Sequence, residues 1–401
     1  MTNQPSHHQV ILTGNGLTAQ IMALCLYHAG CNILWLAGAP AAKSDKTDNR
    51  TTTIHRAGMK MLGALGVLEL LNSPAWPISR ILVSDRQERA GKDWPLDWQD
   101  AEPMAHVVLN TELYHACQTL TKRYDINQHQ LNIASVTTGD RRFVTDSEGT
   151  EHPFDLLVVC AGGHSELISQ AGFRKISQKA GQTALVGMLK SSQSTAHSAY
   201  QRFLAEGPVA LMAMDDSHYS LVWTVSDGTA DRLMALDLPE IDAELNRAFG
   251  TQAGQLSFCD QPLRWPLSPH YIRTIAKNGV VLAGDSAHGL HPLAGMGLNL
   301  GLADAACLLD CLIQARQNGL TPAHISICQT YQTKRQAEIL ALSATTQILN
   351  RWFSRPEGMM RLIGGVGMSV IGRSALMFQL KQLAMGGVLS QPELFSGRLP
   401  Q

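Results

Sequence analysis

The sequence predicts an α/β protein in which a parallel sheet with helices is interrupted by a mostly antiparallel sheet and followed by C-terminal helices. Residues 9–36 read as strand, glycine turn, helix and strand, and residues 280–309 read as a second apolar strand entering a long helix. Residues 78–101 and 181–274 instead alternate short β-rich runs with turn signals, which is typical of antiparallel strands. With 401 residues, 45% of them hydrophobic, the chain is long enough for two or three domains.

Composition narrows the classes of function. Lys and Arg number 32 against 33 Asp and Glu, so the net charge of -1 does not favour nucleic acid as a partner. The eight cysteines are scattered without a CxxC pair, which indicates reduced thiols in a cytosolic protein. The N-terminus lacks the pattern of a secretory signal, and no uninterrupted apolar run reaches the ~18 residues that span a bilayer. We therefore expect a cytoplasmic protein without a transmembrane helix.

The first motif follows the first strand. Val10 to Thr13 is the expected strand, an apolar helix ends near Gly30, and a second strand runs from Asn32 to Leu36. Gly14, Gly16 and Ala19 form G-x-G-x-x-A, in which the first glycine makes a tight turn and the second lets backbone approach a pyrophosphate at the helix N-terminus. The alternative is a plain glycine turn in a βαβ unit. The second strand of a dinucleotide-binding unit usually ends in Asp or Glu, and Ala37 stands there instead.

The remaining elements are expected in order along the chain. Arg50, whose guanidinium could reach a phosphate, precedes a helix predicted over 54–71 that ends around Gly66. A further helix is predicted over 112–123, a buried strand ends in glycines within 155–163, and helices follow from about Ala303 onward. The predicted organisation has three parts: a discontinuous nucleotide-binding domain (1–77, 102–180 and 275–345), an inserted β-sheet domain (78–101 and 181–274), and a C-terminal helical region (346–401).

The stretch 284-GDSAHGLHPLAGMGLNLGLADA-305 resembles the second flavin motif of the FAD-dependent aromatic hydroxylases, the group similar to para-hydroxybenzoate hydroxylase. The variant HPLAGxGLNLGLxDA is most similar to the ubiquinone-biosynthesis hydroxylases of that group. Further resemblance lies in Arg50 with the T-T-T-I that follows it, in 201-QRFLAEGPVALMAM-214, in 220-SLVWTV-225 and in 265-WPLSPHYI-272, so that it extends over nearly the whole chain. It implies a Rossmann-like FAD-binding domain with a β-sheet domain over the substrate.

The resemblance implies a monooxygenase. In this family a reduced flavin and oxygen give a C4a-hydroperoxide that transfers a hydroxyl to an electron-rich ring, with NAD(P)H as the transient reductant. For this chain it implies a lipid-soluble polyprenylated phenol as substrate, in ubiquinone biosynthesis. It also implies work at the inner face of the membrane or in a biosynthetic complex, and the apolar stretch from Leu362 to Ala384 suits a peripheral membrane contact as well as helix packing or a dimer contact.

The resemblance also implies which residues hold the cofactor. In the family the Asp of the GD motif binds the ribityl chain and the following turn lies against the flavin ring; a helix cap is the alternative role for Asp285. The implied cofactor-binding residues are Gly14, Gly16, Ala19, Arg50, Gly284, Asp285, Pro292, Gly295, Met296, Gly297, Leu298 and Asn299.

Neither a catalytic base nor a metal site is assigned. The strand residues Gln201, His218 and Tyr219 are expected to be structural. His288 and His291 lack Cys or carboxylate partners at metal-ligand spacing, so no metal is expected.

Two departures from the family pattern leave the function open. The family's middle motif G-A-D-G-x-x-S-x-V-R has an Asp where this chain has Gly162 and an Arg where it has Ser169, and Ala37 replaces the acidic residue of the first unit. Each lost charged hydrogen bond is worth about 1.5 to 3 kcal/mol. The chain is therefore expected to be an active hydroxylase, with a weakly FAD-binding or non-catalytic partner in a biosynthetic complex as the alternative. A flavin dehydrogenase that does not use oxygen is a third alternative, but no second G-x-G-x-x-G follows a strand.

Overall fold

The computed structural model describes most of the chain. The described residues are 9–38, 50–85, 96–177, 181–289, 296–354 and 392–400.

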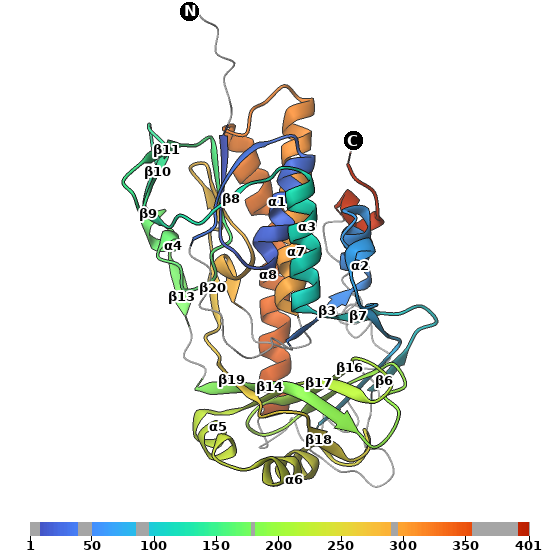
Figure 1. The fold of residues 1–401 in the computed structure, drawn as a ribbon. Helices are drawn as coiled ribbons and strands as arrows, with labels where there is room; N and C mark the ends of the chain where they lie inside the picture. The colour runs from blue at the N-terminus through green and yellow to red at the C-terminus, as the bar shows by residue number, and fades with distance from the viewer. Residues whose placement is uncertain are drawn as a thin grey trace, which may run out of the picture.

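A largely parallel sheet forms one half of the molecule (Figure 1). Its strand order is β21-β22-β12-β1-β2-β8, and only β21 runs antiparallel to its neighbour. The three central strands consist almost wholly of buried aliphatic residues, as a sheet covered on both faces requires. The bounds are β1 Gln9–Thr13, β2 Asn32–Leu36, β8 Gln128–His129, β12 Leu156–Val159, β21 Ala276–Lys277 and β22 Val280–Leu282.

Helices cover one face of this sheet, and a small antiparallel sheet lies on its other side (Figure 1). Helix α1 packs against both α3 and α7, and α7 packs against α8. The small sheet β9-β10-β11 was not predicted, because its strands are short and half exposed. The helices are α1 Leu17–His28, α3 Asn110–Arg123, α4 Leu167–Gln170, α7 Met296–Gln317 and α8 Ile325–Ser354, and the small sheet comprises β9 Ile133–Thr137, β10 Phe143–Asp146 and β11 Glu151–Pro153.

The second large sheet has eight strands and its own hydrophobic core. Its order is β18-β14-β17-β16-β15-β5-β6, with β19 also paired to β14. The prediction of a mostly antiparallel sheet is confirmed, with one exception, since β5 and β15 pair in parallel. The prediction omitted two helices, α5 and α6. The bounds are β5 Arg80–Asp85, β6 Leu96–Gln99, β14 Gln182–Ser191, β15 Ser198–Phe203, β16 Pro208–Ala213, β17 His218–Ser226, β18 Leu256–Phe258, β19 Leu263–Pro266, α5 Asp227–Met234 and α6 Leu238–Phe249.

The two faces of this sheet have different surroundings. Directly paired residues share a face, so the register assigns each side chain. The upper face includes Ser220, whose Oγ accepts a hydrogen bond from Thr51 Oγ1 at 2.6 Å, and therefore looks toward the first half of the molecule. The lower face includes Tyr200, whose ring meets Phe249 of α6 edge-on with centroids 5.8 Å apart. In Figure 1, α5 and α6 lie beneath the sheet.

Two smaller sheets join the halves. The first has the order β3-β7-β4, and the second has the order β13-β20-β23. The bounds are β3 Thr51–His55, β4 Trp76–Ile78, β7 Ala105–Leu109, β13 Lys175–Ser177, β20 His270–Ile272 and β23 His288–Gly289.

Two predicted element boundaries differ from the structure. The helix predicted over 54–71 is instead strand β3, then helix α2 over Arg56–Ala64 and a short 3-10 helix at Leu68–Leu70, because the β-branched run before Arg56 pairs with β7. Helix α7 begins at Met296 rather than near Ala303. The domain limits stay predictions, and Leu362 to Ala384 lies outside the described residues.

One helix among the described residues is long and apolar enough to cross a bilayer. It covers Gly297–Gln317, within α7, and 72% of it is buried inside the protein. Because α7 packs between α1 and α8, its apolar length is explained by its place in the core. A final 3-10 helix, η4 at Glu393–Ser396, packs against α2 and α7.

Candidate functional site

The N-terminus of α1 lies at the carboxyl end of β1. Gly14 has φ of +108°, and a Cβ on it would lie 2.1 Å from the carbonyl oxygen of Cys160. Gly16 is the N-cap, it offers no side-chain cap, and a Cβ on it would meet no atom within 4 Å. Ala19 is fully buried where the helix meets the sheet. Space is therefore open beside the N-terminus of α1, and the first N–H groups of a helix can bind a phosphate at such a place.

Hydrogen bonds from neighbouring elements hold this turn. Trp35 Nε1 donates to the Gly14 carbonyl at 2.8 Å, and Asn15 Oδ1 accepts from Tyr114 Oη at 2.7 Å and from Gln128 Nε2 at 3.4 Å. Asn15 carries no signal of this role in the sequence, since an amide between two glycines reads as an ordinary turn residue. The turn is thus shaped by three different elements.

Ala37 directly follows β2 and is buried, and its N–H donates to the His129 carbonyl at 2.9 Å. The methyl side chain supplies no group that could hold a ribose hydroxyl. Ala37 therefore departs from the usual dinucleotide-binding pattern in the structure as well as in the sequence.

Two glycine-rich segments lie side by side at the ends of β12 and β22. Ser286 Oγ donates to the Gly162 carbonyl at 3.2 Å, and His270 Nε2 donates to the Asp285 carbonyl at 2.8 Å. The His270 ring fits only between glycines, because a Cβ on Gly163 or Gly289 would come within 2.1 or 2.3 Å of it. Residues that are far apart in the sequence thus form one wall at the ends of β12 and β22.

Asp285 has a fixed backbone and a free carboxylate. Gly284 and Asp285 lie in a short 3-10 turn, η2 Gly284–Ser286, directly after β22. The side chain of Asp285 is exposed and has no partner among the described residues. Its carboxylate is therefore available to accept hydrogen bonds from the hydroxyls of a ligand.

A buried charged cluster holds this turn from behind. Asp304 of α7 accepts hydrogen bonds from the Gly284 N–H, His288 Nε2 and Arg335 Nε, each at 2.7 Å, and Arg335 also pairs with Glu338. All four side chains are almost completely buried. Burial by itself raises the pKa of Asp304, but the ion pairs with His288 and Arg335 and the hydrogen bonds from His288 and Gly284 outweigh it and keep this pKa below its usual range. In the sequence, Asp304 is a lone Asp in an apolar helix, and nothing near it indicates that its partners are His288 and Arg335.

This cluster gives His288 a structural role. Its ring donates to Asp304 in the core, and His291 lies outside the described residues. No group of three or more His, Cys, Asp or Glu side chains suited to a metal ion occurs among the residues that the structure describes.

Helix α7 begins beside this wall. Gly297 in its first turn is exposed, and a Cβ there would meet no atom within 4 Å, while Leu298 packs partly buried against the core. The Asn299 amide joins α7 to β3, accepting from the His55 N–H at 3.0 Å and donating to the Thr53 carbonyl at 2.7 Å. Pro292 and Gly295 lie outside the described residues, as does the side chain of Met296.

Glycines at Gly16, Gly162 and Gly297 leave open space at one end of the parallel sheet, since none would place a Cβ within 4 Å of another atom. Ligands of open α/β sheets bind beyond the carboxyl ends of the strands. The open space at these glycines therefore lies where ligands of such sheets bind.

The remaining predicted residues lie at the eight-stranded sheet. The Arg50 guanidinium lies over the Trp265 ring, 5.5 Å from its centroid, at the upper face of the eight-stranded sheet. Gln201 and His218 are on that same face, and His218 Nδ1 lies 2.9 Å from an Asp215 carboxylate oxygen. Tyr219 points to the opposite, lower face and is buried in its core, so it does not belong with the other two.

Buried His55 makes stability depend on pH. Burial lowers its pKa from 6.5 to about 4, so the unfolded chain takes up a proton before the folded chain does as the pH falls below 6.5. The contribution of neutral His55 to the free energy of unfolding is complete above pH 6.5 and is lost as the pH falls toward 4. Between pH 7 and 5 this amounts to about 2 kcal/mol. Urea unfolding should show a smaller loss over this interval in His55→Gln than in the parent, while a matched His115→Gln change at an exposed position should leave the loss unaltered.

Comparisons with known proteins agree with this geometry. The model of the FAD binding domain family matches residues 7–345. Ubiquinone hydroxylase UbiL of Rhodospirillum rubrum is 30% identical over 398 residues, which cover 96% of this chain and 91% of that protein. The 3-demethoxyubiquinol 3-hydroxylase of Escherichia coli is 25% identical, covering 94% of this chain and 97% of that protein. In fold, the chain is similar to Klebsiella pneumoniae HpxO, solved with FAD and uric acid, with a TM-score of 0.70, 17% identity and 98% of each chain covered.

The match to the family model spans most of the chain, and the Rossmann-like sheet, the inserted sheet and the open glycine-lined edge are all present. The chain therefore belongs to the FAD binding domain family of aromatic hydroxylases and is an FAD-dependent monooxygenase.

Proposed function

We propose that the chain hydroxylates the aromatic ring of a polyprenylated phenol in ubiquinone biosynthesis, with NAD(P)H as reductant and O2 as co-substrate. Bound FAD supplies the reduction of O2 and the transfer of a hydroxyl group. Two relatives that match nearly the whole chain are ubiquinone-pathway hydroxylases, which supports a phenolic precursor of this kind. Because such a substrate is lipid-soluble, we also propose that the cytoplasmic protein works at the inner face of the membrane.

We propose that FAD lies along the glycine-lined edge. The backbone N–H groups of α1 would hold the pyrophosphate, with Arg50 near it, and the free carboxylate of Asp285 would hold the ribityl hydroxyls. The N-terminus of α7 would place partial positive charge beside the flavin ring, which favours negative charge on its reduced form. The proposed set is Gly14, Gly16, Ala19, Arg50, Gly284, Asp285, Pro292, Gly295, Met296, Gly297, Leu298 and Asn299.

The upper face of the eight-stranded sheet supports an apolar substrate. Its register places Val186, Ala210, Met212 and Val222 there, and Trp265 beside them is 56% exposed although it is a large hydrophobic residue. An apolar surface on that side excludes water from the reacting ring and matches a prenylated molecule. These apolar residues on the upper face are the observation that supports the substrate class.

The test uses the purified chain saturated with FAD. We expect a polyprenylated phenol to stimulate NAD(P)H oxidation and to yield a product heavier by one oxygen atom in mass spectrometry, with the label from 18O2 incorporated. Stimulation without a hydroxylated product would contradict the proposed reaction, and so would labelling from water instead of from 18O2.

A second candidate is a weakly FAD-binding partner in a biosynthetic complex. The observation in its favour is that Ala37 and Gly162 supply no carboxylate at two places where the family has one. FAD titration separates the two candidates, because a partner of this kind would take up little FAD and release no hydroxylated product even at saturating phenol.

Restoring the two carboxylates should tighten FAD binding. In Gly162 the φ of +80° suits Gly and is tolerated by Asp, and a Cβ there meets no atom within 4 Å, so Gly162→Asp has room. We expect Ala37→Glu and Gly162→Asp each to lower the FAD dissociation constant by about tenfold, the low end of a charged hydrogen bond. Flavin fluorescence quenching measures this, with Ala37→Gln as the uncharged control; equal gains from Glu and Gln would contradict the electrostatic reason.

Removing the carboxylate of Asp285 should have the opposite effect. Its side chain has no partner among the described residues, so Asp285→Asn costs the apo fold nothing while weakening a hydroxyl contact of FAD. We expect the FAD dissociation constant to rise about tenfold or more and the melting temperature of the FAD-free protein to stay within a degree or so of the parent. Unchanged FAD affinity in this variant would remove Asp285 from the proposed site.

A further inference from the structure

A cavity of about 610 Å³ lies on the side of the eight-stranded sheet that faces away from the FAD edge. It is lined by the turn at residues 204–207, by the last residues of β17 and by α5 and α6. Cavities of roughly 300 to 1,000 Å³ accommodate small organic molecules. None of its lining residues belongs to the proposed FAD set.

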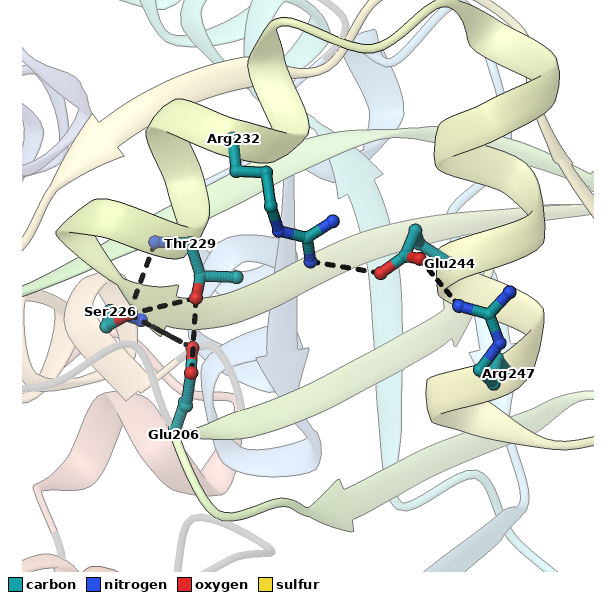
Figure 2. A network of polar contacts seen from close by, with 6 residues as sticks. All are labelled: Glu206, Ser226, Thr229, Arg232, Glu244 and Arg247. Atoms are coloured by element: carbon teal, nitrogen blue, oxygen red, sulfur yellow. Dashed lines mark hydrogen bonds and ion pairs between the residues drawn. The ribbon is translucent and has the colours of Figure 1, made fainter.

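Both carboxylates of this cavity are already engaged, as Figure 2 shows. Glu206 accepts hydrogen bonds from the Ser226 N–H at 3.2 Å and from the Thr229 hydroxyl at 3.1 Å. Glu244 bridges two guanidinium groups, from Arg232 at 3.0 Å and Arg247 at 2.6 Å. These two hydrogen bonds also lower the pKa of Glu244, so its negative charge is retained and used within the pair.

The third guanidinium in the lining has no such partner. Arg202 projects from β15 to the lower face and is only 8% exposed. Its Nη1 donates to the Phe249 carbonyl, its Nε has no hydrogen-bond partner, and no carboxylate pairs with it among the described residues. A buried charge without a counter-ion is costly unless a ligand supplies one. Three guanidinium groups against two carboxylates leave the lining one positive charge in excess.

The lining also includes two threonines, Thr224 and Thr229, and several apolar side chains. Trp223 and Val225 of β17 and Ala248 of α6 contribute to it, with Leu204 from the turn. We propose that this cavity, which we call the lower-face site, binds a small organic carboxylate, whose single negative charge meets Arg202 and Arg232 and whose apolar body contacts Trp223. A single excess positive charge favours a monocarboxylate, which carries one negative charge, over the more highly charged phosphate.

Calorimetry on the full-length, FAD-loaded chain tests the ligand class with three probes. Benzoate carries one carboxylate on an apolar ring, benzamide has the same shape without the charge, and inorganic phosphate has charge without an apolar body. We expect benzoate to bind in the millimolar range or more tightly, and benzamide and phosphate at least about tenfold more weakly, the equivalent of one charge-assisted hydrogen bond. Equal binding of benzamide and benzoate, or binding of phosphate alone, would overturn the proposal.

Variants locate the binding at the lower-face site rather than near the flavin. Arg202→Met and Arg232→Gln should each weaken benzoate binding about tenfold or more. Glu244→Gln should strengthen it several-fold, because Arg232 and Arg247 lose the carboxylate they share. Arg141→Gln, at an exposed ion pair on the small sheet, is the matched control and should change nothing.

These variants distinguish a site from a general charge effect. Arg232 is 55% exposed, so Arg232→Gln is informative even where Arg202→Met folds poorly. Benzoate binding that persists unchanged in Arg232→Gln, or that weakens in Glu244→Gln, would place the ligand elsewhere and refute the lower-face site. FAD content measured in the same samples is expected to stay at the level of the parent.

Discussion

Asp304→Asn should destabilise the protein by about 3 to 5 kcal/mol, the range found when one partner of a buried ion pair is removed. The change is nearly isosteric, so the cost arises from charge. Arg335 keeps Glu338 but loses its second carboxylate, and His288 and the Gly284 N–H lose a charged acceptor. Because Gly284 precedes Asp285, we also expect weaker FAD binding.

Urea unfolding of the FAD-free protein measures this loss, and the same helix provides a control. Asp310 is a partly buried carboxylate whose pKa is raised to about 6, chiefly by burial, so its charge opposes folding at neutral pH. Asp310→Asn should therefore be neutral or slightly stabilising. The electrostatic role of Asp304 is wrong if Asp304→Asn loses no more stability than Asp310→Asn.

The pH dependence of this cluster follows from the direction of the shift. The folded pKa of Asp304 lies below its ordinary value of 3.8, so its contribution is complete above that value and is lost as the pH falls below it. Its effect therefore appears at a lower pH than that of His55, and acid unfolding should show the two losses in succession.

Gly14→Ala should be the most damaging single change in the first glycine motif. The new Cβ would lie 2.1 Å from a backbone oxygen, at a φ of +108° that alanine rarely adopts. Backbone strain and overpacking together should cost about 3 kcal/mol or more, and the turn before α1 should distort. We expect a lower melting temperature and loss of FAD binding together.

Gly16→Ala provides the matched comparison, because the same chemical change meets no atom within 4 Å and has an ordinary φ of -78°. The cost to the FAD-free fold should be below about 1 kcal/mol, that of an alanine N-cap. The added methyl group nevertheless occupies the space where a phosphate would approach α1, so FAD affinity should fall without the loss of stability. If both variants lose stability equally, the two glycines do not have the separate roles assigned to them.

The fold was largely predictable because its signals are local. The apolar strand Val10 to Thr13, the helix that follows it and the strand Asn32 to Leu36 all appear in the structure as predicted. The start of α2 was misjudged, since a run such as Thr51–His55 becomes a strand only by pairing with β7, which the helical periodicity of the following residues concealed.

The site was predictable only in part, because only some of its residues are marked by local sequence signals. Its glycines and Asp285 were identified from a motif and from family resemblance, and their role in holding FAD stays a prediction. The groups that support them were not identified, because their partners are distant in sequence. Asn299 contacts β3 across 244 residues or more, and Asp304 meets Arg335 across 31.

The βαβ unit, the glycine positions and the class of the protein follow from the sequence alone, because backbone conformation and apolar periodicity depend on neighbouring residues. Which buried charges pair, and which face of a strand each side chain occupies, depends on the tertiary structure. Arg202 and Gln201 are adjacent in the sequence but lie on opposite faces of β15. A one-residue step in an extended strand reverses the direction of the side chain, and the elements packed on each face then determine whether it meets the FAD side or the lower-face site.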